Sequence, residues 1–259
     1  MDWHALMQPP DLFSARSVLA IAPHPDDIEV GIGGTIALLA DRGVHVSYLT
    51  LTDGAAGSSD PALIGPLLHS IRRKELQQSG SILGVAEFHW LDLPDTGLAQ
   101  IADLTAQIVT TVRTVRPDAL LTMDPWLPYE MHPDHRAAGF ACVDAFCMSG
   151  IASYNPVDLA RELQPHQCQM IAYYGTHRPN TKVAIDSVFE RKVAAILAHE
   201  SQFSGEGAEF IKAFTAFQGV FGKDADTLVV TPDEPTAYAE LIKVLHSRQS
   251  HYNTQAEWM

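Results

Sequence analysis

The sequence contains few cysteines and no long apolar run. Its 259 residues include three cysteines, Cys142, Cys147 and Cys168, an odd number without the spacing of a metal finger. A disulfide framework is therefore not expected, and Cys142 is predicted to face a helix core. No apolar run approaches the roughly 18 residues that span a bilayer. The start at Met1 lacks the basic and apolar stretches of a secretory signal, so we expect a cytoplasmic protein.

Basic residues are also scarce. Lysine and arginine number 17 against 31 aspartates and glutamates, which gives a formal net charge of −14 at pH 7. Nucleic acids and anionic membranes are therefore not expected as partners, because both carry negative charge. A hydrophobic content of 46% and a charged content of 19% are ordinary for a globular enzyme. With no internal repeat or low-complexity linker, residues 1–259 are predicted to form one domain.

The order of apolar segments predicts the fold class. Strand-like segments lie at 17–22, 44–52, 87–91 and 119–123. Between them, helical patterns begin at 35–41 and cover 67–83, which Gly84 closes, and 101–115. Later in the chain, helices are expected at 139–148 and 187–199, and strands at 170–174 and 183–185. This alternation predicts right-handed βαβ units and a Rossmann-like, three-layer α/β fold with a mostly parallel sheet.

Two polar clusters follow predicted strands. His24-Pro25-Asp26-Asp27 comes after the strand at 17–22, and His132-Pro133-Asp134-His135 follows the strand at 119–123 and a proline-stiffened loop. Ligands bind at this edge of open α/β sheets. Two imidazoles and one carboxylate suit a divalent metal, especially zinc, with an open position for water. A second carboxylate beside that water would be the general base, so Asp26 and Asp27 can divide the two roles of a zinc hydrolase.

Each cluster also has a plain structural explanation. Asp26 or Asp27 can cap a helix within a polar loop, and Pro133 suits the first turn of a solvated helix start. His132 and His135 are three residues apart, however, so both imidazoles can point into one pocket. The joint occurrence of the clusters after two strands favours the catalytic interpretation.

A glycine-rich segment, Gly31 to Thr35, resembles part of a dinucleotide-binding motif. Ile36 stands where the third glycine of that motif belongs, and the carboxylates of Asp26 and Asp27 would repel a pyrophosphate. The glycines are better explained by a tight turn and by close packing of the helix start. Nucleotide binding is the weaker alternative.

Several motifs resemble the LmbE/PIG-L deacetylases. They are HPDDIEVGIGGT at 24–35, IRRKE at 71–75, LPDTGL at 93–98 and DPWLPYEMHPDHR at 124–136. The last run and the HxSQF segment at 199–203 are most similar to the diacetylchitobiose deacetylases. The resemblance covers about 17–205, whereas 205–259 is poorly matched. Many family members have Glu directly after the second Asp, and here Ile28 precedes Glu29. The resemblance implies a zinc-dependent removal of acetyl groups from N-acetylglucosamine units, with N,N'-diacetylchitobiose or short chitin oligomers as substrates.

The resemblance also assigns roles to individual residues. It implies that the zinc ligands are His24, Asp27 and His135. Asp26 becomes the general base, and His132 stabilises the oxyanion or protonates the leaving amine. Outside the ligand set, Asp134 would orient a histidine.

The remaining roles are less specific. Arg72 and Asp95 match positions that contact sugar hydroxyls, although a surface arginine and a turn aspartate would explain them too. For His199 a structural hydrogen bond is expected. Trp126 and Tyr129 could form an apolar wall for a pyranose ring or simply pack within their loop.

The resemblance further implies a homo-oligomer, a trimer or hexamer, in which the tail of a neighbour completes the pocket. Whether His246 or His251 takes this part is left open. Two rival functions also remain. The site could serve a deacetylase or amidase of thiol-cofactor precursors or another N-acyl glycoside. A non-catalytic sugar- or nucleotide-binding module is less favoured, because binding alone needs no spare carboxylate at Asp26.

Overall fold

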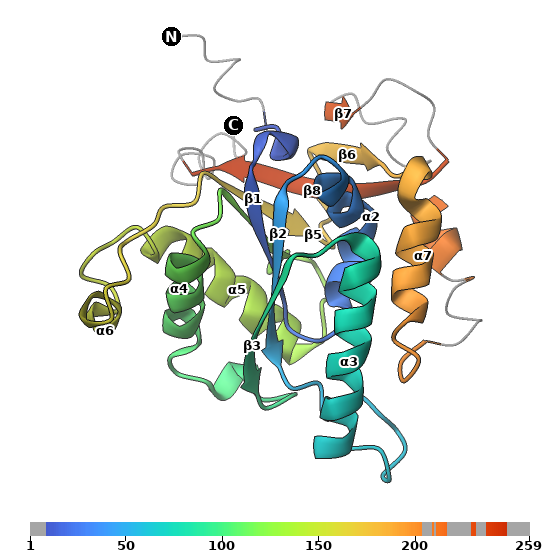
Figure 1. Cartoon of the computed structure of the whole chain (residues 1–259), viewed down its shortest axis with the longest axis horizontal. Coiled ribbons are helices and arrows are strands. Elements are labelled where there is room, and N and C mark those ends of the chain that lie inside the picture. Colours follow the sequence, from blue (N-terminus) through green and yellow to red (C-terminus); the bar gives the residue numbers. More distant parts are fainter. Residues whose placement is uncertain (1–8, 204–208, 210, 217–228, 232–236, 248–259) are drawn as a thin grey trace.

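One sheet forms the centre of the protein (Figure 1). The computed structural model describes residues 9–203, 209, 211–216, 229–231 and 237–247. The strand order is β3-β2-β1-β4-β5-β8-β6-β7. The strands are β1 (Ser17–Ala22), β2 (His45–Thr52), β3 (Glu87–Leu93), β4 (Ala119–Met123), β5 (Met170–Tyr174), β6 (Thr181–Ala184), β7 (Val229–Thr231) and β8 (Ala239–His246). Strands β1 to β5 pair in parallel, whereas β8 runs antiparallel to β5 and β6. The predicted mostly parallel sheet is confirmed.

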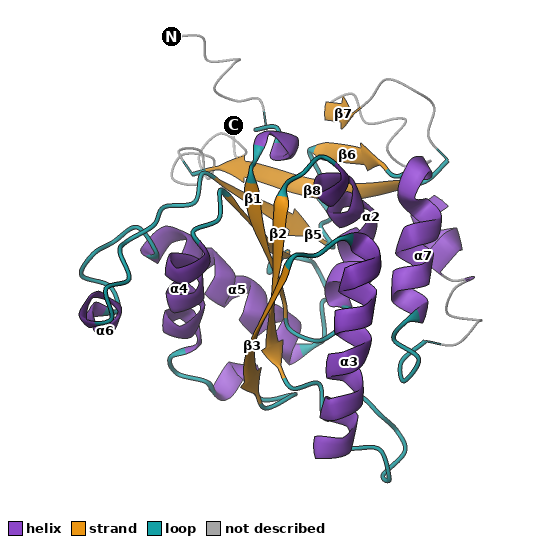
Figure 2. Cartoon of the chain, viewed as in Figure 1, coloured by secondary structure: helices purple, strands orange, loops and turns teal. Residues whose placement is uncertain are grey.

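Helices cover both faces of this sheet (Figure 2). They are α2 (Asp27–Asp41), α3 (Pro66–Leu83), α4 (Leu104–Val115), α5 (Pro133–Met148), α6 (Pro156–Ala160) and α7 (Phe189–Leu197). Helices α2, α3 and α7 pack together on one face, and α4 and α5 on the other. Side chains alternate along a strand, so Tyr48 of β2 enters the core beneath α2 while its neighbour Leu49 enters the core beneath α4 and α5. The three-layer prediction is confirmed.

Two helices begin earlier than the sequence pattern predicted. Helix α2 begins at Asp27 instead of near Thr35, and α5 begins at Pro133 instead of Gly139. In both cases the first turn contains the polar residues of a cluster, which interrupt the apolar period used for the prediction. Helix α2 is also broken at Ile32, where φ is −143° and ψ is 25°. The first turns of these helices therefore carry Asp27 and His135, and the helix start at Pro133 agrees with the structural alternative considered for that cluster.

The glycine-rich segment lies inside α2, so the predicted tight turn is wrong. The predicted close packing is present. A Cβ atom on Gly31 would lie 2.5 Å from the ring of Tyr174, and one on Gly34 would lie 2.7 Å from Ile185. Larger side chains at either position would push the helix away from its neighbours.

The other predicted elements agree with the structure to within a few residues. Strand β3 extends to Leu93, and α4 begins only at Leu104 because a 3-10 turn occupies Leu98–Gln100. Gly84 ends α3 with a φ of +89° and donates its N–H to helix carbonyls, as a C-cap glycine should. The prediction for this helix end is confirmed.

The structure also describes the cysteines and the apolar content of the helices. All three cysteines are described, each is a free thiol, and Cys142 is buried in α5 as predicted. Among the described residues, no helix combines the length and the apolar content needed to cross a bilayer.

Candidate active site

The two polar clusters meet because β1 and β4 are neighbours. These strands pair in parallel, with Val18 opposite Ala119, so the loops after their carboxyl ends lie side by side. Strand β1 pairs with β2 on its other edge, and the strand order therefore reverses at β1. Open α/β sheets bind ligands at such a switch point. Asp26 lies where the loop after β1 enters α2, and His132 is the N-cap of α5.

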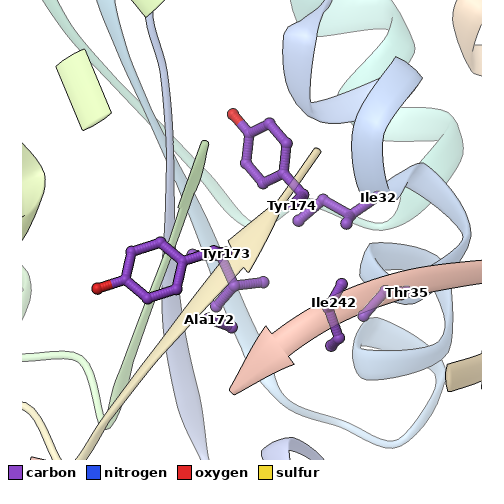
Figure 3. Close-up of a pocket in the computed structure, with 7 residues that line it drawn as sticks. Ile32, Thr35, Ala172, Tyr173, Tyr174 and Ile242 are labelled. Carbon is purple, nitrogen blue, oxygen red and sulfur yellow. The ribbon is translucent and has the colours of Figure 1, made fainter. Parts of the chain in front are cut away.

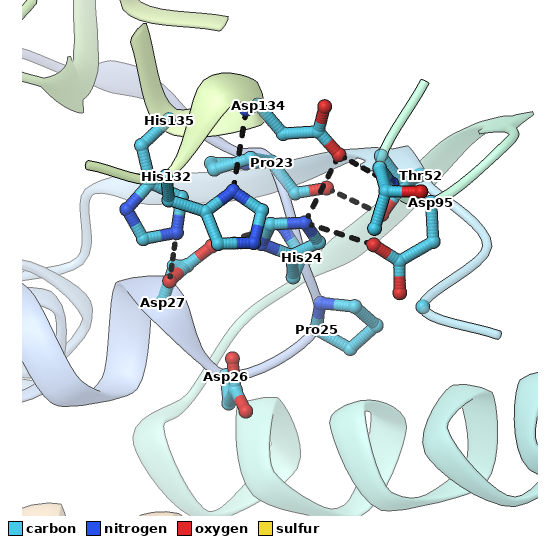
Figure 4. Close-up of polar contacts among 12 residues, drawn as sticks. Pro23, His24, Pro25, Asp26, Asp27, Thr52, Asp95, His132, Asp134 and His135 are labelled. Atoms are coloured by element: carbon cyan, nitrogen blue, oxygen red, sulfur yellow. Dashed lines mark hydrogen bonds and ion pairs between the residues drawn. The ribbon is translucent and has the colours of Figure 1, made fainter. Parts of the chain in front are cut away.

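Three imidazoles and one carboxylate form what we call the histidine pocket: His24, His132, His135 and Asp27 (Figure 4). Nitrogen atoms of the three histidines lie within 4.8 Å of one another. Asp27 Oδ2 is 3.3 Å from His24 Nδ1, and Asp27 Oδ1 is 3.5 Å from His135 Nε2. Burial opposes ionisation of Asp27, but its contacts with His24 outweigh this effect and lower its pKa. Asp27 is therefore a carboxylate that faces two imidazoles at once.

Two further carboxylates hold the outer edge of His24. His24 Nε2 is 3.3 Å from Asp134 Oδ2 and 3.2 Å from Asp95 Oδ1. Asp134 also accepts the backbone N–H groups of Thr96 and Leu98 at 2.7 and 3.0 Å. Burial would lower the pKa of His24, but Asp134, Asp27 and Asp95 outweigh it and raise the pKa to about 12. The structure thus places Asp134 against a histidine, where an orienting residue is required.

The donor atoms of the histidine pocket fit a divalent metal. With Nε2 of His24 held by carboxylates, its Nδ1 is left to face Asp27. His135 turns its Nε2 towards the same carboxylate. Three carboxylates around one imidazole are an excess of negative charge that a cation would balance, and imidazole with carboxylate suits zinc and similar metals.

A second set of close donors lies on the outer edge of the same ring. It consists of His24, Asp95 and Asp134. The oxygens of Asp134 already accept backbone N–H groups and the imidazole. Asp95 and Asp134 therefore hold the Nε2 side of His24, while the histidine pocket contains the atoms that could bind a metal.

Asp26 adopts a strained backbone conformation beside the pocket. Its φ is +126°, a value that non-glycine residues rarely adopt and that clusters at functional sites. This conformation turns its carboxylate away from the neighbouring Asp27 (Figure 4). Asp26 Oδ2 instead accepts a hydrogen bond from Arg72 Nη2 at 3.0 Å. Burial raises the pKa of Asp26 to about 7, although Arg72 opposes the shift. A carboxyl with such a pKa can both accept and return a proton near neutral pH.

Arg72 is buried beneath the loop that carries Asp26. Its Nη2 also donates to Pro25 O at 2.6 Å, and its Nη1 donates to Gly54 O at 3.2 Å. A Cβ atom on Gly57 would lie 2.5 Å from Nη1, so the loop after β2 closes tightly over the guanidinium. In the structure Arg72 supports the loop that carries Asp26, and contact with a sugar hydroxyl stays a prediction for Arg72 and for Asp95.

His132 can donate a hydrogen bond without being charged. Its Nδ1 accepts the backbone N–H of Asp134 at 3.2 Å, so a neutral ring carries its proton on Nε2. Burial and the charge of His24 lower the pKa of His132, which favours that neutral form. His132 therefore offers an N–H donor at the histidine pocket.

Sequence reasoning missed the role of Glu130. Its Oε1 accepts the backbone N–H of His132 at 2.8 Å, and its Oε2 lies 3.5 Å from His135 Nδ1. One side chain thus contacts both histidines of the downstream cluster. Glu130 lies inside the DPWLPYEMHPDHR motif, which was the only signal in the sequence.

Sequence reasoning also missed the role of Glu75, for which the IRRKE motif was the only signal. It accepts the backbone N–H and the hydroxyl of Ser201 at 2.8 and 2.7 Å. Two motifs that are far apart in the sequence, IRRKE and HxSQF, are therefore joined by one carboxylate.

The hydrogen bond predicted for His199 is absent among the described residues. The ring is fully buried and neither nitrogen has a hydrogen-bond partner. Glu29 Oε2 lies 3.8 Å from His199 Nε2, which is too long for a hydrogen bond. Burial lowers the pKa of His199 to about 3, so the ring is neutral.

Trp126 and Tyr129 behave differently in the loop before His132. Trp126 packs edge-on against Phe140 and Tyr173, which supports the loop-packing explanation for this residue. The side chain of Tyr129 is 96% exposed at a backbone φ of +65°. Both alternatives for Tyr129 remain predictions.

The fold and the site together are typical of a class of protein, the α/β metal-dependent hydrolases. It has a mostly parallel α/β sheet with a potential metal centre at the carboxyl edge, beside a carboxyl group with a raised pKa. Comparison with known proteins narrows this class. The family model PIG-L, described as GlcNAc-PI de-N-acetylase, matches residues 19–146. The chain is 46% identical over 188 residues to the diacetylchitobiose deacetylase of Thermococcus kodakarensis, covering 73% of this chain and 70% of that protein.

Further relatives agree with this assignment. The solved structure of N,N'-diacetylchitobiose deacetylase from Pyrococcus horikoshii matches with a TM-score of 0.87 and 34% identity, over 98% of this chain and 93% of that one. A probable N-acetyl-alpha-D-glucosaminyl L-malate deacetylase 2 of Bacillus anthracis is 27% identical, covering 77% of this chain and 87% of that protein. The chain belongs to the PIG-L family of de-N-acetylases. The predicted resemblance and the predicted enzyme class, a deacetylase, are confirmed.

Proposed function

We propose that this enzyme is a zinc-dependent deacetylase of a small amino sugar, with N,N'-diacetylchitobiose or a short chitin oligomer as its substrate. The products are acetate and the free amine. The observation that carries the proposal is the separation of two adjacent carboxylates. Asp27 faces His24 and His135, whereas Asp26 is turned aside and bonded to Arg72. A hydrolase needs this division between metal ligand and general base.

The proposed ligands are His24, Asp27 and His135, with one zinc ion per chain. When bound, zinc would act as a Lewis acid towards the acetyl carbonyl and would ease the deprotonation of water. Behind the ligands, the contact of Asp134 with His24 Nε2 supports an orienting role.

The residues of this chain then account for the proton transfers. Asp26 takes a proton from the attacking water while the water oxygen forms a bond to the acetyl carbonyl carbon. The Nε2–H of His132 donates to the developing oxyanion. As the carbon–nitrogen bond breaks, Asp26 returns the proton to the amine. The neutral tautomer of His132 supports oxyanion stabilisation over proton delivery.

A second candidate substrate is N-acetylglucosaminyl malate, as a precursor of a thiol cofactor. The 27% identity to the Bacillus anthracis deacetylase favours keeping it in the comparison. Acetate release from N-acetylglucosamine, its β-1,4 dimer, an N-acetylglucosaminyl inositol and N-acetylglucosaminyl malate would be measured at equal concentrations. We expect the highest kcat/KM on the dimer. A clear preference for the malate or inositol compound would assign the enzyme to another branch of the family.

Metal content tests the ligand set independently of substrate. In His24→Ala and His135→Ala we expect the zinc content of the purified protein to fall sharply. His132→Ala should keep its zinc and lose turnover. Stoichiometric zinc in both ligand variants would overturn the assignment.

From the family resemblance we further propose a cytoplasmic homo-oligomer, a trimer or hexamer. Light scattering on the protein as it elutes from a size-exclusion column gives its molecular mass and so tests the oligomeric state. His246 ends β8 opposite Met170, at the amino edge of β5 and so away from the histidine pocket of its own chain. His251 lies outside the described residues.

A further inference from the structure

Helix α2 is held in a broken shape by a buried ion pair from two other elements. At Ile32 the backbone leaves the helical region, so regular helical bonding cannot continue through this point. On the far side of the break, the N–H groups of Gly34 and Thr35 donate to Glu240 of β8 at 2.9 and 2.7 Å. On the near side, Lys192 Nζ donates to Val30 O at 2.9 Å.

The pair itself joins the two sides of the break. Lys192 Nζ donates to Glu240 Oε1 at 2.5 Å, and the Thr35 hydroxyl donates to Glu240 Oε2 at 2.6 Å. Lys192 is 1% exposed and Glu240 is fully buried. Burial of two charges is costly unless their remaining hydrogen bonds are satisfied. Here they are satisfied by the backbone of α2, so the pair and the break stabilise each other.

The sheet side of the break is closely packed. Ile32 and Thr35 lie against Tyr174 of β5 and Ile242 of β8, with no room for a water molecule between them (Figure 3). Tyr174 also donates its hydroxyl to Ile21 O of β1 at 3.0 Å. The side of the break that faces the sheet is therefore packed against β5 and β8.

The near side of the break leads directly to the histidine pocket. The first part of α2 runs from Asp27 to the break, and Val30, which Lys192 holds, lies one turn from Asp27. We propose that the Lys192–Glu240 pair is a positioning device for Asp27. It fixes the direction in which the first part of α2 presents this carboxylate to His24 and His135. The inference rests on the metal-ligand role proposed for Asp27.

The test compares this pair with a matched pair elsewhere. Arg113 Nη1 and Asp158 Oδ2 are 2.9 Å apart and as deeply buried, on the face covered by α4 and α5. The full chain is prepared with Glu240→Gln or with Asp158→Asn. Thermal unfolding gives Tm, and titration of the metal-free protein with Co²⁺ gives a dissociation constant and a visible absorption spectrum. We expect a lower Tm in both variants. Only Glu240→Gln should weaken Co²⁺ binding and shift the absorption spectrum. We expect a loss of affinity of about 10–100-fold, the range typical for residues that orient a metal ligand.

A milder pair of variants covers the case in which Glu240→Gln fails to fold. Thr35→Val removes one hydrogen bond to Glu240, and Thr110→Val removes the corresponding bond to Asp158. We expect Co²⁺ to bind more weakly to the first than to the second. Equal Co²⁺ affinity within a matched pair, with a lowered Tm, would show a purely structural ion pair and overturn the inference. Absence of metal binding by the unchanged enzyme would instead overturn the proposed function.

Discussion

Asp26 and Asp27 are adjacent in the chain and have opposite acid–base behaviour. Burial raises the pKa of Asp26 to about 7, whereas the contacts with His24 lower the pKa of Asp27. The cause is conformational, because the positive φ of Asp26 sends the two side chains to different surroundings. Strain at one residue thus gives two identical side chains different surroundings, which supports the separate roles proposed for them.

Replacement of Asp26 tests this separation. Asp26→Asn keeps the size of the side chain and removes its basicity, so we expect the variant to fold, to keep its zinc and to change KM little. Loss of a general base typically lowers kcat by about 10²–10⁴-fold. Zinc content and acetate release would be measured together, with Asp27→Asn as the control that loses metal. Near-normal turnover of zinc-loaded Asp26→Asn would contradict the mechanism, and loss of its zinc would mean that the two roles are exchanged.

The pH dependence of the reaction depends on Arg72. Asp26 acts as a base only when ionised, so kcat/KM should fall as the pH drops below the pKa of its carboxyl. Arg72 favours the ionised form and lowers that pKa. Its removal in Arg72→Met should therefore raise the pKa and move the acid limb of the pH–rate profile to higher pH. Arg73→Met, which breaks an exposed pair with Asp92, is the control. An unmoved limb in Arg72→Met would remove Arg72 from this role.

At the scale of the elements, Glu130 links the loop before α5 to the ligands. Its carboxylate contacts the His132 backbone and lies near His135 Nδ1. In Glu130→Gln one oxygen acceptor remains but the charge is lost, so we expect zinc affinity to fall about tenfold, as for other groups behind a ligand. Competition with a chromophoric chelator measures this. Equal affinity to the unchanged enzyme would mean that Glu130 shapes the loop and does not tune His135.

Strands could be predicted from the sequence more reliably than helix starts. Strands β1 and β4 are continuous apolar runs bounded by polar residues, and the predicted bounds are confirmed. The start of α2 could not be predicted, because polar residues in its first turn interrupt the apolar period, and the break at Ile32 depends on residues from α7 and β8. The family motifs indicated Asp95 and Asp134 as site residues. Only the fold shows that both side chains contact the same nitrogen of His24, because this contact joins residues that are far apart in the sequence. Long-range contacts carry no local periodicity.

At the scale of the molecule, β8 joins the end of the chain to the catalytic sheet. It comes from the part that the family motifs match poorly, yet it lies between β5 and β6 and supplies Glu240. This arrangement supports our proposal that the chain forms a single domain.

The net charge of −14 gives a test of substrate class. Raising the ionic strength from about 0.01 M to 0.15 M shortens the screening length from about 30 Å to 8 Å. The acidic protein repels the anionic N-acetylglucosaminyl malate, so kcat/KM on this compound should rise with salt, whereas kcat/KM on neutral diacetylchitobiose should stay constant. Acetate release at several salt concentrations measures both, with N-acetylglucosamine as a neutral control. A salt-independent rate on the malate compound would show that charge plays no part in the choice.

The place of β8 also sets the order in which the enzyme can mature on the ribosome. His24, Asp27 and His135 are synthesised long before Glu240, whose carboxylate is needed to complete the bent form of α2. A nascent chain that ends before β8 carries every proposed ligand but lacks the carboxylate that holds the far side of the break in α2. If the proposed positioning role is correct, we expect such a truncated chain to bind metal more weakly than the chain that includes β8.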